Sequence, residues 1–206
     1  TTDGKADPTF NSSNPNNPYG TRVGNQFAID ANGNLLWPKN DPSYPGINVT
    51  RLNSSYGSID PLFTNENNQG NWLGAIAIDA NNNPVIGGSF TQIGGQSRNN
   101  IARLNSDGKV DTTFNPNILS NYSYPGVEGI AIDANGKLLV NGQFNSVGGQ
   151  PINSSLIRLN SDGTLDSTFN PSLSSSISQI AVDGNSKILV ADQNRIVRLN
   201  NDGTED

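Results

Sequence analysis

Three residue types are missing from this sequence of 206 residues: cysteine, histidine and methionine. A chain without cysteine can form no disulfide, no thiol nucleophile and no thiolate metal site. A chain without histidine lacks the commonest general base and the commonest metal ligand of proteins. Because no recognisable catalytic motif is present either, we predict that the protein is not an enzyme and has no catalytic residue, no metal and no cofactor.

Charge is scarce as well. Only 15% of the residues are charged, the net charge is −6, and the 12 lysines and arginines are spread along the chain. Binding to nucleic acid or to an anionic membrane surface requires concentrated positive charge. No apolar run reaches the length of a transmembrane helix. The sequence therefore predicts neither nucleic acid nor a membrane as a partner.

The chain does contain many short apolar runs separated by turn residues. Hydrophobic residues make up 33% of the sequence and fall in runs such as residues 130–132 and 137–140. Asn, Ser, Gly, Asp and Pro, which favour turns, fill the gaps between them. Many short strands joined by tight turns have this composition, and no segment shows a helical period. The sequence predicts an all-β protein with essentially no helix.

Three motifs recur along the chain. The first is apolar-Ala-apolar-Asp followed by turn residues, and its copies are residues 27–33, 76–82, 130–136 and 180–186. The second is Arg-Leu-Asn, which begins at Arg51, Arg103, Arg158 and Arg198. The third runs from Asp-Gly to Phe-Asn, and its copies are residues 107–115 and 162–170, a degenerate copy over 56–63, and residues 3–11. Their order indicates four tandem units of about 50 residues.

The third unit has the pattern of a four-stranded antiparallel meander. Its strands are expected at residues 127–133, 137–144, 155–160 and 164–169. Asn135 and Gly136 between the first two strands predict a type I′ turn, in which both residues have positive φ. Such a unit cannot bury both faces of its sheet alone, so neighbouring units must stack. Radial stacking of these sheets gives a β-propeller.

The predicted fold is one domain over residues 1–206, a β-propeller of four four-stranded antiparallel blades. The units span about 4–56, 57–107, 108–162 and 163–203. Both ends of the chain carry a copy of the same Asp-Gly turn. We therefore expect residues 1–10 to complete the last blade, so that N- and C-terminal strands close the ring. A chain cut at repeat boundaries, or two chains that pair into a larger ring, are the alternatives.

Two stretches resemble a known repeat. The motifs IAIDANGKLLVNGQF at residues 130–144 and IARLNSDGKVDTTFNP at residues 101–116 resemble the delta-60 repeat, a bacterial β-propeller repeat. The resemblance covers nearly the whole chain, although the first unit has residues 37–40 in place of Gly-Gly-Ser-Phe and the last lacks the Gly-Gly loop. It implies a propeller in secreted, cell-surface or phage-encoded proteins. It implies no known activity and no functional residues.

The recurring charged residues have structural interpretations. Asp107 and Asp162 resemble part of a calcium loop, but each is more simply the Asp of its own hairpin turn. The four aspartates of the first motif could surround a cation at a propeller axis, yet a role in each turn is favoured; they are Asp30, Asp79, Asp133 and Asp183. The four arginines of the second motif are expected to form ion pairs with aspartates of the repeat.

Aromatic residues outside the repeat are the candidate binding residues, because the repeat does not need them and they are free to contact a partner. They lie in or near the loops between units and in the first unit's insertion: Tyr19, Trp37, Tyr44, Trp72, Tyr122 and Tyr124. Their aromatic rings would suit sugar rings or a protein surface. The alternative is that they fill gaps between blades.

The sequence as a whole favours a non-enzymatic structural or binding module on a virion or cell surface, with an extracellular location. It would present its loops to a glycan or to protein neighbours in an assembly, and an oligomer is compatible with this role. A phage appendage or a capsid-decorating protein would fit. The alternatives are an adhesin fragment of a larger bacterial surface protein and a carbohydrate-active enzyme on a propeller scaffold, since two carboxylates can hydrolyse a glycoside without histidine.

Overall fold

The computed structural model describes residues 27–41, 46–55, 57–122, 126–173, 177–192 and 194–206. These residues form strands, turns and loops only, which confirms the all-β prediction. Within these ranges there is no helix, and therefore none long and apolar enough to cross a membrane. The predicted closing strand at residues 1–10 lies outside the described residues.

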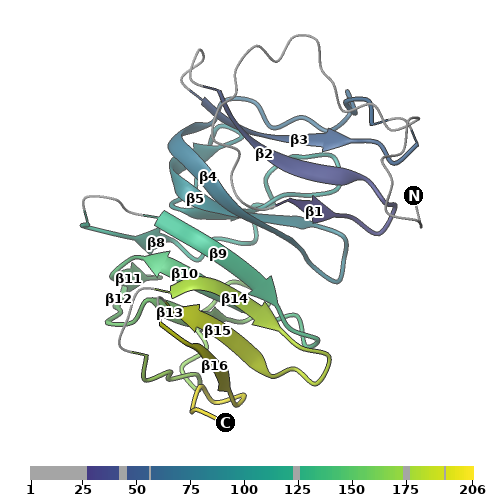
Figure 1. Ribbon diagram of the computed structural model, residues 1–206. Helices are drawn as coiled ribbons and strands as arrows, with labels where there is room; N and C mark the ends of the chain where they lie inside the picture. The colour runs from purple at the N-terminus through teal and green to yellow at the C-terminus, as the bar shows by residue number, and fades with distance from the viewer. Residues whose placement is uncertain (1–26, 42–45, 56, 123–125, 174–176, 193) are drawn as a thin grey trace.

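The strands form four consecutive antiparallel sheets, one from each repeat (Figure 1). Unit 1 consists of β1 (Ala28–Ile29), β2 (Leu35–Asp41) and β3 (Gly46–Leu52). Unit 2 consists of β4 (Gln69–Ile78), β5 (Pro84–Ile93), β6 (Gln96–Ser97) and β7 (Ile101–Arg103). Unit 3 consists of β9 (Gly126–Ile132), β10 (Leu138–Gln143) and β13 (Leu156–Leu159). Unit 4 consists of β14 (Ile177–Val182), β15 (Ile188–Asp192) and β16 (Ile196–Leu199).

A fifth, small sheet accompanies unit 3. It is made of β8 (Ile118–Leu119), β11 (Ser146–Val147) and β12 (Gln150–Pro151), in the order β12-β11-β8. The Gly-Gly loop at residues 148–149 joins its last two strands, and both glycines have positive φ. Unit 2 has the corresponding hairpin between β5 and β6, around Gly94 and Gly95.

The turn between the first two strands of a unit differs from the predicted type I′ turn. In unit 3, the amide of Gly136 donates to the carbonyl of Asp133 at 2.9 Å, and of the predicted pair only Gly136 has positive φ, at 76°. The Asp133 carboxylate accepts the amides of Asn135 and Lys137 at 2.8 and 2.9 Å. These bonds keep Asn135 at negative φ, which gives a type I turn followed by a left-handed residue. The type I′ prediction is therefore wrong.

The fourth strand of each unit is shorter than predicted. It is reduced to one isolated bridge, Leu159 with Leu165 after unit 3, and to equivalent bridges after the other units. Because these residues pair back onto the preceding sheet, each hairpin after an Asp-Gly turn is counted from here on with the unit before it. Directly after this bridge the chain turns, because the amide of Phe169 donates to the carbonyl of Asp166 at 3.3 Å. The turn carries the Phe169 ring into the core, where it is 5% exposed. The turn that buries this ring therefore ends the fourth strand after one bridge.

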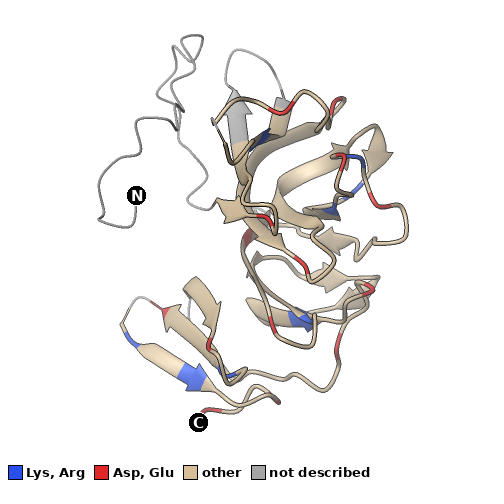
Figure 2. Cartoon of the chain, turned by 90° about the vertical axis from the view of Figure 1, so that its right-hand side faces the viewer, with Lys and Arg blue, Asp and Glu red and all other residues tan. Residues whose placement is uncertain are grey.

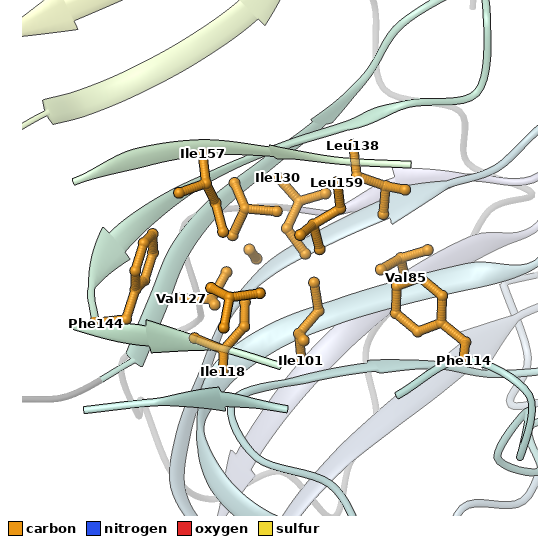
Figure 3. Packing of buried hydrophobic residues seen from close by; sticks show 13 residues of the cluster. Val85, Ile101, Phe114, Ile118, Val127, Ile130, Leu138, Phe144, Ile157 and Leu159 are labelled. Atoms are coloured by element: carbon orange, nitrogen blue, oxygen red, sulfur yellow. The ribbon is translucent and has the colours of Figure 1, made fainter. Parts of the chain in front are cut away.

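The core consists of layers between successive sheets. We call the side that a sheet turns toward the next unit its leading face, and the opposite side its trailing face. Side chains of a strand alternate between the two faces. On the trailing face of unit 3, Ile130 and Ile157 pack with Val85 and Ile101 of unit 2 (Figure 3). Each such side chain, when fully buried, contributes roughly 1.5–3 kcal/mol.

The leading face of unit 3 makes the next layer. Leu139 and Leu156 lie there, both 0% exposed, and they pack with Ile188 and Val190 of unit 4. A third layer joins unit 1 to unit 2 in the same way. Three interfaces of one kind therefore hold four units in sequence.

The described residues do not form the predicted closed ring. Phe27 on the trailing face of unit 1 is 67% exposed, and Ile196 on the leading face of unit 4 is 76% exposed. In Figure 2 the sheet beside the C-terminus lies apart from the sheets in the upper half of the view. Closure of four blades needs these two faces to cover one another, and here both are open to solvent.

Candidate functional site: a polar cleft between the first two units

The recurring aspartates belong to turns. The carboxylate oxygens of Asp30, Asp79, Asp133 and Asp183 each accept backbone amides two and four residues further along the chain. Asp107 and Asp162 likewise accept the amides of Lys109 and Thr164 at 3.1 and 2.9 Å. The predicted role in turns is confirmed for both sets. In the described part of the chain, no three acidic side chains gather closely enough to hold a metal ion.

The recurring arginines join neighbouring units. Arg158 is 2% exposed; its Nε donates to Asp166 Oδ2 at 2.7 Å, and its guanidinium lies 4.7 Å from the centre of the Phe169 ring. Its Nη1 donates to the carbonyl oxygen of Asn201 in unit 4 at 2.6 Å. Arg103 and Arg51 repeat this arrangement one and two units earlier, respectively. We call these three residues the inter-unit arginines, and they confirm the predicted ion pairs.

The ionisation of Asp166 reflects this setting. Burial raises the pKa of Asp166, but hydrogen bonds from Lys137, Thr168 and Arg158 outweigh it and hold the pKa well below its usual value. The charged carboxylate is therefore the stable form in the fold. Its hydrogen-bonding capacity is occupied by partners within the repeat, which indicates a structural role.

The aromatic candidates do not form one site. Trp37 is half-buried on β2, and its indole nitrogen is buried without a hydrogen-bond partner among the described residues. Trp72 is half-buried on β4, and a Cβ on Gly126 of β9 would lie 2.8 Å from its ring, so the indole fills the space between units 2 and 3. Tyr122 is 51% exposed. The other three, Tyr19, Tyr44 and Tyr124, lie outside the described residues.

A polar cleft of about 470 Å³ lies where the linker between units 1 and 2 meets two turns of unit 2. Three segments line it: the linker at residues 64–67, the β5–β6 turn at Gly94, and the hairpin at residues 109–112. Apart from Val110, the side chains around it are amides, hydroxyls, one carboxylate and one ammonium group; they include Thr64, Glu66, Asn67, Gln96, Lys109 and Thr112. Its volume lies within the usual range of small-molecule sites.

Buried polar contacts fix the linker in place. The side chain of Asn65 is buried; its Oδ1 accepts the amide of Val49 at 2.9 Å and its Nδ2 donates to the carbonyl of the same residue at 2.7 Å. On the other side, the carbonyl of Asn67 accepts the amide of Gly95 at 3.1 Å. A Cβ at Gly108 would lie 2.8 Å from the backbone of Thr64, so glycine lets the hairpin approach the linker. The cleft is thus a formed feature of the scaffold.

Two charged residues face this cleft. Glu66 and Lys109 both line it and both are exposed. Lys109 Nζ donates to Asp107 Oδ2 at 2.8 Å. This hydrogen bond raises the pKa of Lys109 and, together with a backbone amide bond, lowers that of Asp107. Lys109 therefore presents a cation at neutral pH.

Glu66 does not belong to the repeat. Where unit 1 continues Phe63 with Thr-Asn-Glu, the next two units continue with Asn-Pro, at residues 114–116 and 169–171. Lys109 varies between copies: the residue after the motif's glycine is Lys5 in the N-terminal copy, Ser58 in the degenerate copy, and Thr164 and Thr204 in the last two. Residues that the repeated scaffold does not require are free to serve a ligand. Sequence reasoning overlooked both residues, although a comparison of the repeats position by position would have shown Glu66.

Comparisons with known proteins bear on the fold and on the function. Residues 85–114 and 134–169 match the profile of a family described as a domain of unknown function (DUF5122) β-propeller. This match supports a β-propeller family for the chain, while the narrower resemblance to the delta-60 repeat stays a prediction. No curated protein matches the sequence closely enough to count as a relative.

Several solved structures share the fold. A gluconolactonase from Xanthomonas campestris is 14% identical, with a TM-score of 0.58 over 88% of this chain and 60% of that one. A virginiamycin B lyase from Staphylococcus aureus is 18% identical, with a TM-score of 0.56 over 87% of this chain and 53% of that one. The extracellular domain of a one-component system from B. thetaiotaomicron is 17% identical, with a TM-score of 0.54 over 91% of this chain and 22% of that one. The chain thus spans little more than half the length of the two enzymes.

These comparisons correct the functional prediction. A non-enzymatic module on a virion or cell surface was expected, and that prediction is wrong, as is the statement that the protein is not an enzyme. The solved structures that overlay nearly nine-tenths of the chain include a gluconolactonase and a virginiamycin B lyase, both enzymes by name. Nothing in the comparisons points to a phage or a capsid. The findings favour the carbohydrate-active enzyme that the sequence left as an alternative.

Proposed function

We propose that this chain is part of a carbohydrate-active enzyme on a β-propeller scaffold. Its polar cleft would bind a sugar lactone or a similar cyclic ester and open the ring with water. The observation that carries the proposal is that Glu66 and Lys109, two opposite charges, line one cleft, and that Glu66 has no counterpart at the equivalent positions of the next two units. The fold shared with a gluconolactonase suggests the substrate class.

The cleft offers groups suited to this chemistry. Amide and hydroxyl side chains such as Asn67, Gln96 and Thr112 can hold the hydroxyls of a sugar through hydrogen bonds. The Glu66 carboxylate can take a proton from a water molecule as the water oxygen bonds to the acyl carbon. The Lys109 ammonium can stabilise the negative charge that develops on the carbonyl oxygen. The ring C–O bond then breaks, and the departing oxygen takes the proton to become a hydroxyl.

The scaffold would be larger than one set of four units. We propose that the four units are consecutive blades of a propeller built from delta-60-type repeats, and that the protein acts outside the cell. The match of units 2 and 3 to a β-propeller family supports the first part. The likeness to an extracellular domain supports the second.

The test is hydrolysis of glucono-δ-lactone. The acid that forms releases a proton, and the rate of proton release in a weak buffer measures the reaction. The unaltered chain is expected to exceed the buffer rate, and Glu66→Gln is expected to lower that excess by about 10²–10⁴-fold, the usual contribution of a general base. Glu205→Gln is the matched control, because it is the same substitution at a site outside the cleft. Glu205 lies in unit 4, where it pairs with Arg195 on the surface. No turnover by the unaltered chain, or equal rates for both variants, would refute the proposal.

A further inference from the structure

Unit 1 carries an apolar face without a neighbour. Position for position, Phe27 in unit 1 corresponds to Ile76 in unit 2 and Ile130 in unit 3. Phe27 is 67% exposed, whereas Ile76 is 4% and Ile130 is 5% exposed. Ile29, two residues further on the same trailing face, is 60% exposed. In units 2 and 3 the leading face of the preceding unit covers this position, and in unit 1 no described residue does so.

Unit 4 carries the complementary open face. Ile196 lies two residues before the recurring arginine of unit 4. The residues at the same position are Leu156 in unit 3 and Ile101 in unit 2. Ile196 is 76% exposed, and the other two are 0% exposed. The arginines differ in the same way, because the side chain of Arg198 is 57% exposed and that of Arg158 only 2%. The leading face of unit 4 is thus built like those inside the molecule but is uncovered.

The inner interfaces show what covers such a face. Each inter-unit arginine donates Nη1 to a turn carbonyl of the next unit, at Ser106, Ser161 and Asn201 respectively. Each acceptor is the residue after the Asn that opens the Asp-Gly hairpin of that unit. In unit 1 the same place belongs to Ser54, in an exposed turn closed by a hydrogen bond from the Gly57 amide to the Asn53 carbonyl at 3.1 Å.

Arg198 has only half of this arrangement. Its Nε pairs with Asp206 Oδ2 at 2.6 Å, as the inter-unit arginines pair within their own units. No turn of a following unit lies within the described residues to take the other half of its guanidinium. The face that would supply such a turn, the trailing face of unit 1, is at the other end of the described chain, and no described residue covers it. The two open faces therefore carry the same kinds of apolar and hydrogen-bonding groups as the faces that meet between the inner units.

We propose that a second copy of this chain covers both open faces. The leading face of unit 4 in one copy would pack on the trailing face of unit 1 in the other, with Arg198 donating to the turn at Ser54 of that copy. Because each copy has one face of each kind, two copies form two identical contacts and leave none open. The result is a ring of eight units, within the usual four to eight blades of a propeller.

The solved structures of the same fold are longer than this chain. The chain spans 60% of the gluconolactonase and 53% of the lyase, so 40% and 47% of those chains lie beyond the part that it matches. A second copy would add further units to the scaffold. The proposal does not depend on the cleft or on catalysis, since neither end face includes Glu66 or Lys109.

The experiment measures mass in solution by light scattering during size-exclusion chromatography. The chain of 21.8 kDa is expected to elute at twice that mass. Ile196→Asp and Ile29→Asp each place a charge on one of the two open faces. Each is expected to raise the dissociation constant by about 30-fold or more, the size of an interface hot spot. Leu62→Asp is the matched control, because Leu62 is 78% exposed but belongs to neither end face.

Mixing the two variants gives the sharper result. Ile196→Asp keeps an intact unit 1 face and Ile29→Asp keeps an intact unit 4 face, so a mixture is expected to recover a dimer through one sound contact. Far-ultraviolet circular dichroism checks that each variant is folded. A monomer at every concentration of the unaltered chain would overturn the proposal. So would a dimer that both variants leave intact, or variants that fail to associate when mixed.

Discussion

Arg158 and Arg198 occupy the same position of the same motif, yet their surroundings differ. Arg158 lies between units 3 and 4, with its side chain 2% exposed, and contacts an aspartate, an aromatic ring and a turn carbonyl. Arg198 lies on the last sheet with its side chain 57% exposed and is paired with Asp206. A repeated motif therefore has no fixed energetic value, because its contribution depends on whether another unit covers it.

The largest expected contrast lies in the apolar neighbours of these arginines. Leu156→Ala opens a cavity in the layer between units 3 and 4 and should cost about 2–5 kcal/mol. Ile196→Ala removes an exposed side chain and should change stability by no more than about 0.5 kcal/mol. Thermal unfolding of the dilute monomer compares them. A large loss for Ile196→Ala would mean that unit 4 is already covered within one chain.

Removal of each arginine should give a difference in the same direction. Arg158→Ala removes one of the two cations that contact the buried carboxylate of Asp166, the other being Lys137, and should lower the free energy of unfolding by about 1.5–3 kcal/mol. Arg198→Ala removes an exposed pair and should cost no more than about 1 kcal/mol. Urea unfolding at a concentration where the chain is monomeric measures both. Equal losses would show that burial does not separate the two positions.

Acid should weaken the buried pair of Arg158 and Asp166 more than the exposed pair of Arg198 and Asp206. The folded-state pKa of Asp166 is lowered, so its contribution is complete above the unfolded pKa of about 3.9 and is lost as pH falls further toward the folded pKa. Stability should therefore drop below about pH 4, and Asp166→Asn should flatten that drop. Asp206→Asn should flatten it less, since its partner Arg198 is largely exposed. Urea midpoints at pH 6 and pH 3 give the comparison, and identical profiles would contradict it.

Local structure followed closely from local sequence. The first three strands of unit 3 were expected at residues 127–133, 137–144 and 155–160, and they occur at 126–132, 138–143 and 156–159. The aspartates lie in their predicted turns, because an Asp oxygen reaches backbone amides two and four residues away without help from distant residues. The turn type was wrong because that same carboxylate restrains Asn135, which the Asn-Gly pattern by itself does not reveal.

The candidate site could not be predicted in this way. Its walls come from residues 64–67, 94–96 and 109–112, and only the packing of the linker against two turns of unit 2 brings these segments together. Glu66 and Lys109 each look like an ordinary surface charge in the sequence. The aromatic residues were more conspicuous, but Trp72 lies between units 2 and 3 rather than around a cleft.

The sequence by itself determined the repeat, the all-β fold, the turns and the pairing of arginine with aspartate within each unit, since these depend on residues that are close along the chain. Tertiary structure decided which copies of a motif are buried and which are exposed, and where three loops meet as a cleft. The physical reason is that burial depends on a neighbouring surface. Four equivalent faces in the sequence become three covered faces and one open face once the units are stacked.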